Sequence, residues 1–327
     1  MTIRLGLQIP NFSYGTGVEE LFPTVVRQTR EAEASGFDTV FVMDHFYQLP
    51  MIGAPEEPML EAYTALGALA SATSTIQLST LVTGNTYRNP TLLAKAVTTL
   101  DVVSGGRAIL GIGAGWFELE HQQLGFEFGT FTDRFERLSE ALEIIPPMLR
   151  GERPTFSGKY YRTETAINEP RYRSNIPIMI GGSGEKKTFG LAVKYADHLN
   201  LLSALDEIPH KLSVLRQRCE EAGRDPSTLE TSAFFSVFVA EDSATAWKLA
   251  GDQLRKNGLD LETLPEDVRT QVLGRTVVGS PEEIAEQVQT RVLDQGIDSV
   301  TLNVPGNGHV PGVVELIGNT LRPLFKD

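Results

Sequence analysis

The sequence is short of cysteine, of basic residues and of long apolar runs. Cys219 is its only cysteine, so an internal disulfide is excluded, and the charged segment around it indicates a structural residue rather than a nucleophile. The 29 Lys and Arg stand against 42 Asp and Glu, and this net charge of −13 disfavours nucleic acid and anionic lipid as partners. No apolar run reaches the roughly 18 residues of a membrane span, and the start of the chain lacks the features of a signal peptide. We therefore expect a soluble, cytoplasmic protein.

Familiar nucleotide and metal fingerprints are missing as well. The turn at Gly181–Gly184 matches neither the G-x-G-x-x-G pattern of dinucleotide-binding domains nor the Walker pattern. The other four histidines form no recognisable ligand spacing with His45, which argues against a metal site.

Short β-branched runs alternate along the chain with longer amphipathic stretches, as is typical of parallel strands joined by helical crossovers. Eight such units favour a closed (β/α)8, TIM-like barrel, and the length suits one barrel domain over residues 1–327. The expected strands are Ile3–Ile9, Asp38–Asp44, Ile76–Val82, Ala108–Gly113, Pro177–Ile180, His198–Leu202, Thr231–Val239 and Ser299–Val304. The expected helices are Glu19–Ser35, Glu61–Ala72, Thr91–Val103, Asp133–Leu149, Glu185–Ala196, Glu207–Ala222, Ala244–Asn257, Pro281–Asp294 and Val313–Leu321.

Two segments interrupt this alternation and are expected to be insertions. In the first, at about 151–175, the stretch TFSGKYYRT indicates a small hairpin around a Ser-Gly turn. The second, at about 259–279, has mixed charge and a proline, which predicts a mobile segment near the site.

Barrel enzymes carry their active sites at the carboxyl ends of the strands, so residues that follow each strand are the first candidates. Asp44 and His45 end the second expected strand. An imidazole there can move a proton near neutral pH, and an adjacent acidic residue can orient it. A packed or surface histidine is the plainer alternative, and the position at a strand end is what favours catalysis.

Two glycine-rich segments follow other strands. Gly181–Gly184 lies between a short apolar strand and a helix expected from Glu185, where free backbone N–H groups can bind phosphate. Gly111–Trp116 allows a flat ring or a phosphate chain to approach the backbone, with Trp116 as a wall. The alternatives are a tight strand–helix turn for the first segment and relief of crowding in the barrel mouth for the second.

With these segments in view, nearly the whole chain resembles the bacterial luciferase-like flavin and deazaflavin oxidoreductases. The matching stretches are LVTGNTYRNPTLLAKAVTTLDVVSGGRAILGIGAGWFELEHQQLGF, IPIMIGGSGEKKTFGLAVKYADHLNL, TVVGSPEEIAEQVQ and GIDSVTLNVP. The resemblance implies a bacterial luciferase-like barrel with insertions, usually dimeric, that holds the ring of the cofactor at its carboxyl end. It also implies a non-proline cis peptide bond, which residue-by-residue matching places at Thr80–Leu81.

The Asp-His pair resembles the deazaflavin branch of this family, so we expect coenzyme F420 as the cofactor, with FMN as the alternative. The resemblance implies that His45 and Asp44 are the catalytic residues. The cofactor-binding residues that it implies are Thr80, Leu81 and Thr83 beside the ring, Ala114, Gly115 and Trp116 beside the ribityl chain, and Gly181, Gly182, Ser183 and Gly184 at the phosphate. Lys186, Lys187 and Arg88 are expected near the cofactor exit, where they would favour the acidic oligoglutamate tail of F420.

The function that follows is an F420-dependent oxidoreductase, a homodimer that transfers a hydride between the deazaflavin and a small organic substrate. Some sugar-phosphate dehydrogenases of this branch carry a Glu where this chain has Trp116, so their second acid/base residue cannot be carried over. Glu118 and Glu120 are not nominated as replacements. An FMN-dependent monooxygenase is the alternative enzyme, and a non-catalytic flavin-binding protein is the alternative outside enzymes.

Overall fold

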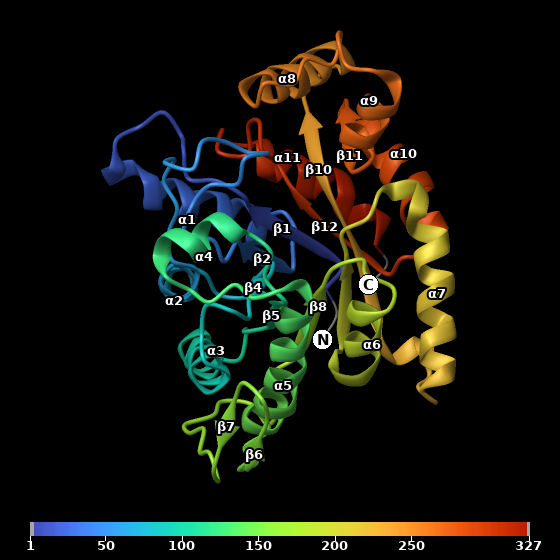
Figure 1. The fold of residues 1–327 in the computed structure, drawn as a ribbon. Helices are drawn as coiled ribbons and strands as arrows, with labels where there is room; N and C mark the ends of the chain where they lie inside the picture. The colour runs from blue at the N-terminus through green and yellow to red at the C-terminus, as the bar shows by residue number, and fades with distance from the viewer. Residues whose placement is uncertain (1–2, 326–327) are drawn as a thin grey trace.

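Parallel strands close into a barrel in the computed structural model, which describes residues 3–325 (Figure 1). The strands are hydrogen-bonded in the order β3-β2-β1-β12-β10-β9-β8-β5-β4. A parallel bridge between Leu78 and Ala108 joins β3 to the segment before β5 and closes the ring. The strands of the ring are β1 (Leu5–Ile9), β2 (Thr39–Val42), β3 (Gln77–Thr80), β4 (Thr83–Gly84), β5 (Leu110–Gly113), β8 (Ile178–Gly181), β9 (His198–Leu201), β10 (Glu230–Val239) and β12 (Ser299–Asn303).

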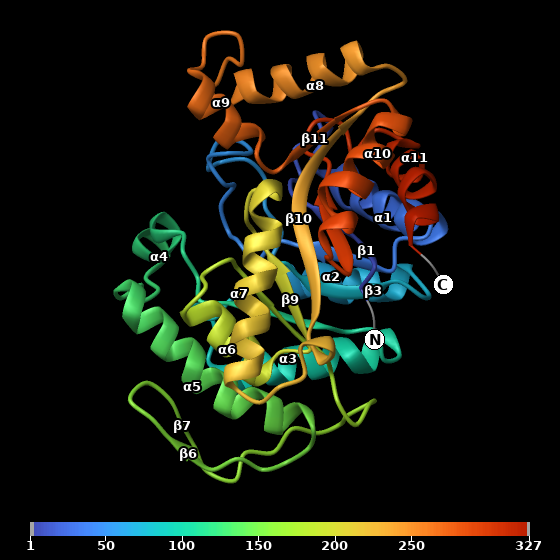
Figure 2. The same cartoon turned by 90° about the vertical axis from the view of Figure 1, so that its right-hand side faces the viewer.

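Helices surround the barrel on the outside (Figures 1 and 2). They are α1 (Val18–Ala34), α2 (Ala62–Ala72), α3 (Pro90–Ser104), α5 (Phe131–Leu149), α6 (Lys187–Tyr195), α7 (Ile208–Glu221), α8 (Ser243–Lys256), α10 (Pro281–Arg291) and α11 (Val313–Leu321). Each expected strand and each expected helix is found, with ends shifted by a few residues. The barrel prediction is therefore confirmed. Within residues 3–325, no helix has the length and apolarity needed to cross a membrane.

The elements outside the expected alternation include α4 (Glu118–Leu124), α9 (Glu266–Leu273) and β11 (Thr276–Gly279). The first follows β5 directly. The other two lie in the segment 259–279, and β11 pairs in parallel with the carboxyl-terminal half of β10, from Ser236 to Val239. This segment therefore adds a strand beside β10.

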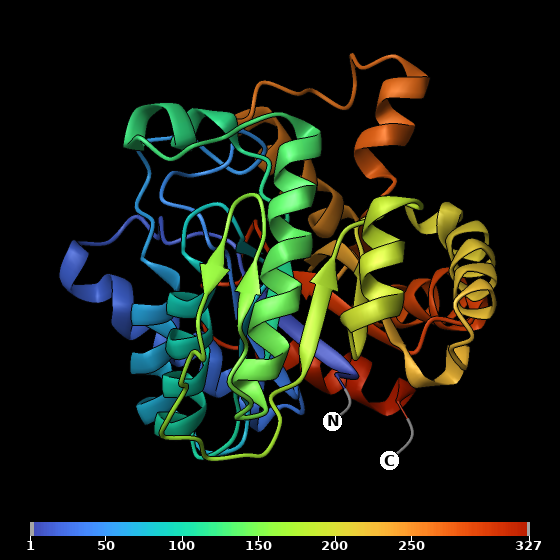
Figure 3. The ribbon, with the colours of Figure 1, turned by 60° about the horizontal axis from the view of Figure 1, so that its bottom comes forward.

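The segment 151–175 contains the short antiparallel hairpin of β6 (Phe156–Ser157) and β7 (Arg162–Thr163). Figure 3 shows the hairpin lying against α5. Glu140 of α5 accepts hydrogen bonds from the backbone amides of Lys159, Tyr160 and Tyr161 at the hairpin tip. One carboxylate thus fixes the turn that the Ser-Gly pair predicted. Of the expected single domain over 1–327, residues 1–2 and 326–327 lie outside the described residues.

The interior of the barrel is divided between apolar and polar side chains. A small apolar cluster inside the ring is formed by Ile3, Phe41, Leu81, Ile109 and Met179. On the side of β9, β10 and β12, the Asn200 amide donates to the hydroxyls of Ser232 (2.7 Å) and Thr301 (2.6 Å). Nearer the carboxyl end, Asn303 donates to the Gln8 oxygen (3.2 Å), and Gln8 donates to the carbonyl of Leu81 (3.0 Å).

Three glycines make room for the chain between β3 and β4. A Cβ atom at Gly111 would lie 2.0 Å from the carbonyl oxygen of Thr80, which no side chain tolerates. At Gly113 and Gly181 it would lie 2.8 and 2.7 Å from methyl carbons of Val82. Relief of crowding therefore accounts for Gly111 and Gly113, and it applies to Gly181 as well.

Gly111→Ala should lower the free energy of unfolding by about 3 kcal/mol or more, because the new methyl group meets backbone rather than a movable side chain. Gly67→Ala is the matched control: Gly67 lies inside α2 with no atom within 4 Å of its Cβ position, so alanine should stabilise by about 0.5–1 kcal/mol. Urea unfolding of both variants measures the difference. A Gly111→Ala protein as stable as the unchanged chain would contradict this packing.

Candidate active site at the carboxyl end of the barrel

The segments predicted to form the site come together at one end of the barrel. Asp44 and His45 follow β2, and the segment 80–83 joins β3 to β4. Residues 114–116 follow β5, and Gly181–Gly184 covers the end of β8 and the turn after it. Because β2 pairs with β3, and β4, β5 and β8 are consecutive in the ring, these segments line neighbouring strand ends.

The non-proline cis peptide bond joins Leu81 to Val82, so its predicted place at Thr80–Leu81 is wrong by one residue. Thr80 still belongs to β3, where it pairs with Val42 of β2 and its hydroxyl donates to the carbonyl of Gly111 (3.0 Å). The chain leaves the ladder only after Thr80. The carbonyl held by Gln8 is that of Leu81, the residue that begins the cis bond.

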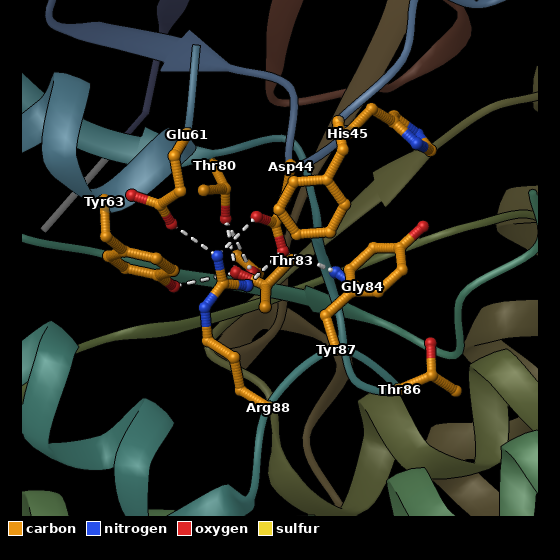
Figure 4. A network of polar contacts seen from close by, with 12 residues as sticks. Asp44, His45, Glu61, Tyr63, Thr80, Thr83, Gly84, Thr86, Tyr87 and Arg88 are labelled. Carbon is orange, nitrogen blue, oxygen red and sulfur yellow. Dashed lines mark hydrogen bonds and ion pairs between the residues drawn. The ribbon is translucent and has the colours of Figure 1, made fainter. Parts of the chain in front are cut away.

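Asp44 is buried and forms a two-pronged ion pair with Arg88 (Figure 4). The guanidinium donates to both carboxylate oxygens at 2.6 and 2.9 Å and also to Glu61 at 2.6 Å, and the Gly84 amide donates to Asp44 at 3.1 Å. Burial opposes the charge of the guanidinium, but the Asp44 carboxylate holds the pKa of Arg88 above its usual range. Both oxygens of Asp44 are occupied, so it anchors the end of β2 rather than contacting the imidazole of His45.

The prediction that Arg88 is a basic neighbour of the cofactor tail is wrong for this reason. Its side chain is only 11% exposed and serves two carboxylates. Lys187 donates to the Thr132 hydroxyl (3.3 Å) and lies over the ring of Phe131 on α5. Lys186 is exposed and precedes α6, which begins two residues later than expected.

A chain of hydroxyl groups runs beneath this ion pair. Thr83 lies 2.7 Å from the hydroxyls of both Thr80 and Tyr63. The Arg88 guanidinium lies over the Tyr63 ring, 5.0 Å from its centre. Burial and the nearby Asp44 charge raise the pKa of Tyr63, so the phenol stays protonated and able to donate. Thr80, Leu81 and Thr83 are all buried, and Val82 is the half-buried residue of this segment.

His45 contacts a carboxylate that the sequence interpretation did not nominate. Its Nδ1 lies 2.8 Å from Oε2 of Glu120, which is fully buried on α4. In Figure 4 the imidazole points away from the Asp44–Arg88 pair. Glu118, the other acidic residue just after Trp116, is exposed and accepts a hydrogen bond from Gln122. The signal that could have indicated Glu120 is the short helix ELEHQQL, in which it is the third residue.

The Glu120 carboxylate is surrounded by hydrogen-bond donors. Its Oε1 accepts from the backbone amides of Phe46 and Tyr47, and its Oε2 accepts from the Tyr87 hydroxyl. Burial alone would raise the pKa of Glu120, but hydrogen bonds from His45, Tyr87 and the Tyr47 amide outweigh it and lower the pKa. At pH values above the usual pKa of glutamate, the ionised Glu120 therefore stabilises the folded state. This stabilisation is lost as the pH falls through the lower pKa that Glu120 has in the folded protein.

The segment after β5 is shaped by His121 and Thr86. His121 is buried, and its Nδ1 donates to the carbonyl of Phe117 (2.7 Å) while the Thr86 hydroxyl lies 2.7 Å from Nε2. Burial lowers the pKa of His121, which favours this neutral form. Gly115 has a φ of +80°, and a Cβ there would lie 2.7 Å from the Thr86 hydroxyl. Trp116 is 52% exposed, with its ring 5.8 Å from that of His45.

The turn at Gly181–Gly184 has the chemistry of a phosphate site. Gly182 has a φ of +139°, and a Cβ at Gly182 or Gly184 would lie 3.2 or 3.0 Å from Thr188. The Ser183 hydroxyl donates to the carbonyl of Leu202 (3.3 Å). Ser203, which follows Leu202, has a buried hydroxyl without a hydrogen-bond partner among the described residues. Glycine backbone and an unpaired hydroxyl suit an oxyanion. Residues 3–325 contain no cluster of His, Cys, Asp and Glu placed to hold a metal ion.

A closed parallel α/β barrel with a histidine, an open strand-end turn and polar anchors at its carboxyl end has the architecture of a barrel enzyme. Residues 3–299 match the luciferase-like monooxygenase family, and the chain belongs to that family.

Relatives of known name share most of the chain. It is 31% identical to an F420-dependent glucose-6-phosphate dehydrogenase of Nakamurella multipartita, with 96% of each chain covered. It is 30% identical to the F420-dependent hydroxymycolic acid dehydrogenase of Mycobacterium tuberculosis, over 87% of this chain and 81% of the other. Among solved structures, the coenzyme F420-dependent tetrahydromethanopterin reductase of Methanopyrus kandleri has the same fold, with a TM-score of 0.80, 20% identity and all of both chains covered.

Arg88→Met should lower the free energy of unfolding by about 3–5 kcal/mol, because Asp44 would remain buried without its counter-ion. Arg150→Met is the control, since Arg150 and its partner Glu152 are 46% and 57% exposed and should contribute less than about 1 kcal/mol. Adding Asp44→Asn to Arg88→Met should recover part of the loss, as chemical denaturation can measure. Equal losses in the two single variants would contradict the importance of the buried pair.

Proposed function

We propose that this protein is an F420-dependent oxidoreductase that transfers a hydride between the deazaflavin and a small organic substrate. The observation that carries the proposal is the likeness, over most of the chain, to relatives that are named F420-dependent dehydrogenases. The Asp44–His45 pair at the end of β2 supports it, because it resembles the pair of the deazaflavin branch. The two relatives act on different substrates by name, so the proposal stops at a small organic molecule.

The residues at the barrel mouth fit such a cofactor. Leu81, supported by Thr80 and Thr83, would lie against the ring, and Ala114, Gly115 and Trp116 would border the ribityl chain. The turn Gly181, Gly182, Ser183 and Gly184 would bind the phosphate, with the unpaired Ser203 hydroxyl beside it. The deazaflavin supplies hydride transfer when bound. The protein would hold the ring, exclude water and move the accompanying proton.

His45 is the residue proposed to move that proton. Its Nδ1 is held by Glu120, and its Nε2 has no hydrogen-bond partner among residues 3–325. Nε2 is therefore free to accept a proton from a substrate hydroxyl or to return one to a carbonyl oxygen. Asp44 would contribute by anchoring the strand end that carries His45, through its ion pair with Arg88.

Sugar phosphates are not part of this proposal. Trp116 stands where related sugar-phosphate dehydrogenases are expected to carry an acid/base glutamate, and Glu120 is committed to His45, Tyr87 and two amides. Trp116 offers an apolar ring, half exposed, at the place where that glutamate would face the substrate.

An FMN-dependent monooxygenase is the second candidate, because the family to which the chain belongs is described by that activity. A non-catalytic flavin-binding protein is the third, and the open Nε2 of His45 favours an enzyme over it. We further propose that the chain acts in the cytoplasm as one barrel domain with two insertions, and as a homodimer, which is the state that the resemblance implies.

Fluorescence titration of the purified apoprotein should show tighter binding of F420 than of FMN. Gly182→Val should weaken F420 binding at least about tenfold, because a branched side chain would stand between the backbone and the phosphate. Since the φ of Gly182 strains any side chain, thermal unfolding of the variant must be measured beside its affinity. Gly190→Val, on the exposed face of α6 with no atom within 4 Å of its Cβ position, is the control.

Two results would count against this assignment. Unchanged F420 affinity in a folded Gly182→Val protein would remove the turn from the phosphate site. Equal or tighter FMN binding, with oxygen consumption when the reduced complex meets substrate, would replace the F420 proposal with the monooxygenase.

His45→Ala should lower kcat by roughly 10²–10⁴-fold with little change in the dissociation constant of F420, because a general acid–base group would be lost. The exposed His210, which pairs with Glu185 on the surface, supplies the control variant His210→Ala. Steady-state kinetics and cofactor titration of both variants test the role. Normal turnover of a His45→Ala protein that binds F420 normally would exclude His45 from the mechanism.

A further inference from the structure

Three hydrogen-bond donors converge on the Glu120 carboxylate, besides its contact with His45. The Phe46 and Tyr47 amides can only donate, and both reach Oε1. The Tyr87 hydroxyl donates to Oε2, which also lies 2.8 Å from Nδ1 of His45. A carboxylate with this many donors around it is held in its ionised, acceptor-only form. The bond to His45 therefore requires the hydrogen to sit on Nδ1.

The imidazole of His45 is mostly buried, and the second of its two nitrogens makes no hydrogen bond within residues 3–325. Nε2 of His45 has no hydrogen-bond partner in the described part of the chain, and the side chain is 13% exposed. Trp116 and Phe117 lie edge-on to the ring, each with its centre at 5.8 Å, and Trp116 is half exposed at the mouth. A neutral imidazole with hydrogen on Nδ1 carries its lone pair on Nε2.

We propose that Glu120 is a positioning residue that fixes His45 in the Nδ1–H tautomer, so that an unprotonated Nε2 is presented to the substrate. This inference rests on the proposed function for its catalytic meaning. Oε2 of Glu120 holds the ring, and the other oxygen, Oε1, is fixed by the backbone amides of Phe46 and Tyr47, the two residues that follow His45. The proton acceptor and the carboxylate that orients it are thus locked to the same short loop after β2.

The same carboxylate would balance the charge that develops in turnover. When a substrate hydroxyl gives its proton to Nε2, the imidazole becomes a cation whose other N–H already points at Glu120. The other ionisable groups around it are committed elsewhere: Asp44 to Arg88, Tyr87 as a donor to Glu120, and His121 to Thr86 and a backbone carbonyl. Glu120 is the carboxylate in direct contact with the ring.

Replacing Glu120 by glutamine should reverse the tautomer. The two backbone amides still need an acceptor, so the amide oxygen would stay with them and the amide NH2 would face His45 and Tyr87. That NH2 can only donate, so Nδ1 would have to accept and the hydrogen would move to Nε2. The lone pair would then no longer face the substrate.

The experiment has two arms. In the apoprotein labelled with ¹⁵N-histidine, long-range ¹H–¹⁵N spectra at about pH 9, above the range in which histidine ordinarily titrates, identify the tautomer of His45. We expect Nδ1–H in the unchanged protein and Nε2–H in Glu120→Gln. In steady-state assays with F420, Glu120→Gln should lower kcat by roughly 10²–10⁴-fold while the dissociation constant of F420 stays within about threefold.

Glu118→Gln is the matched control, because it removes an exposed carboxylate from the same helix and should change neither readout. Nε2–H in the unchanged protein would overturn the inference without any variant, as would full turnover in a folded Glu120→Gln protein whose tautomer has reversed. A loss of turnover without a change of tautomer would also overturn it, since the loss would then be structural. Lack of F420-dependent turnover in the unchanged protein would overturn the proposed function, while the tautomer spectra would still decide the Glu120–His45 geometry.

Discussion

The ion pair between Asp44 and Arg88 is the constraint on which the arrangement of the mouth depends. It ties the end of β2 to the segment before α3, across the point where the chain leaves β3. The Asp44 side chain is only 2% exposed, and a charge buried to that extent is tolerated only when it is paired and hydrogen-bonded. Arg88 and the Gly84 amide supply these hydrogen bonds. With the carboxylate and the backbone around it fixed, the next side chain, His45, leaves β2 in a defined direction, toward α4.

Steric exclusion complements this electrostatic anchor. Val82 fills the space beside Gly113 and Gly181, so β5 and β8 can approach the β3–β4 segment only because they lack side chains there. The glycines of the mouth are therefore of two kinds. Gly111, Gly113 and Gly181 allow strands to pack, whereas Gly115 and Gly182 adopt positive φ values in the turns that follow.

The sequence predicted the barrel because strand and helix periodicities are local, and each expected element is long enough to show one. It did not predict α4, which has seven residues and few apolar ones, or β11, which lies within the segment 259–279 that was expected to be an insertion. The error at the cis bond has a similar origin. A matched motif locates an irregular stretch, but only the pairing of Thr80 with Val42 shows where the ladder ends.

Prediction of the site failed where partners are distant in the chain. The pairing of His45 with Glu120 spans 75 positions, and that of Asp44 with Arg88 spans 44, so neither follows from spacing. Arg88 in particular was expected to be an exposed cation, because a sequence gives no measure of burial. Residue type and strand-end position were enough to nominate His45, but the direction of its ring required the fold.

One interior contact has a consequence for how the protein is made. The carbonyl of Leu81 is held by Gln8 of β1, and Gln8 is in turn held by Asn303 of β12. The first and last strands of the chain thus support a peptide that directly follows the third strand, β3. On the ribosome, where residues emerge in order, this support cannot be complete until almost the entire chain has been synthesised. This part of the mouth therefore gains its last hydrogen bond only when β12 is in place, although most side chains of the mouth are encoded in the first half of the sequence.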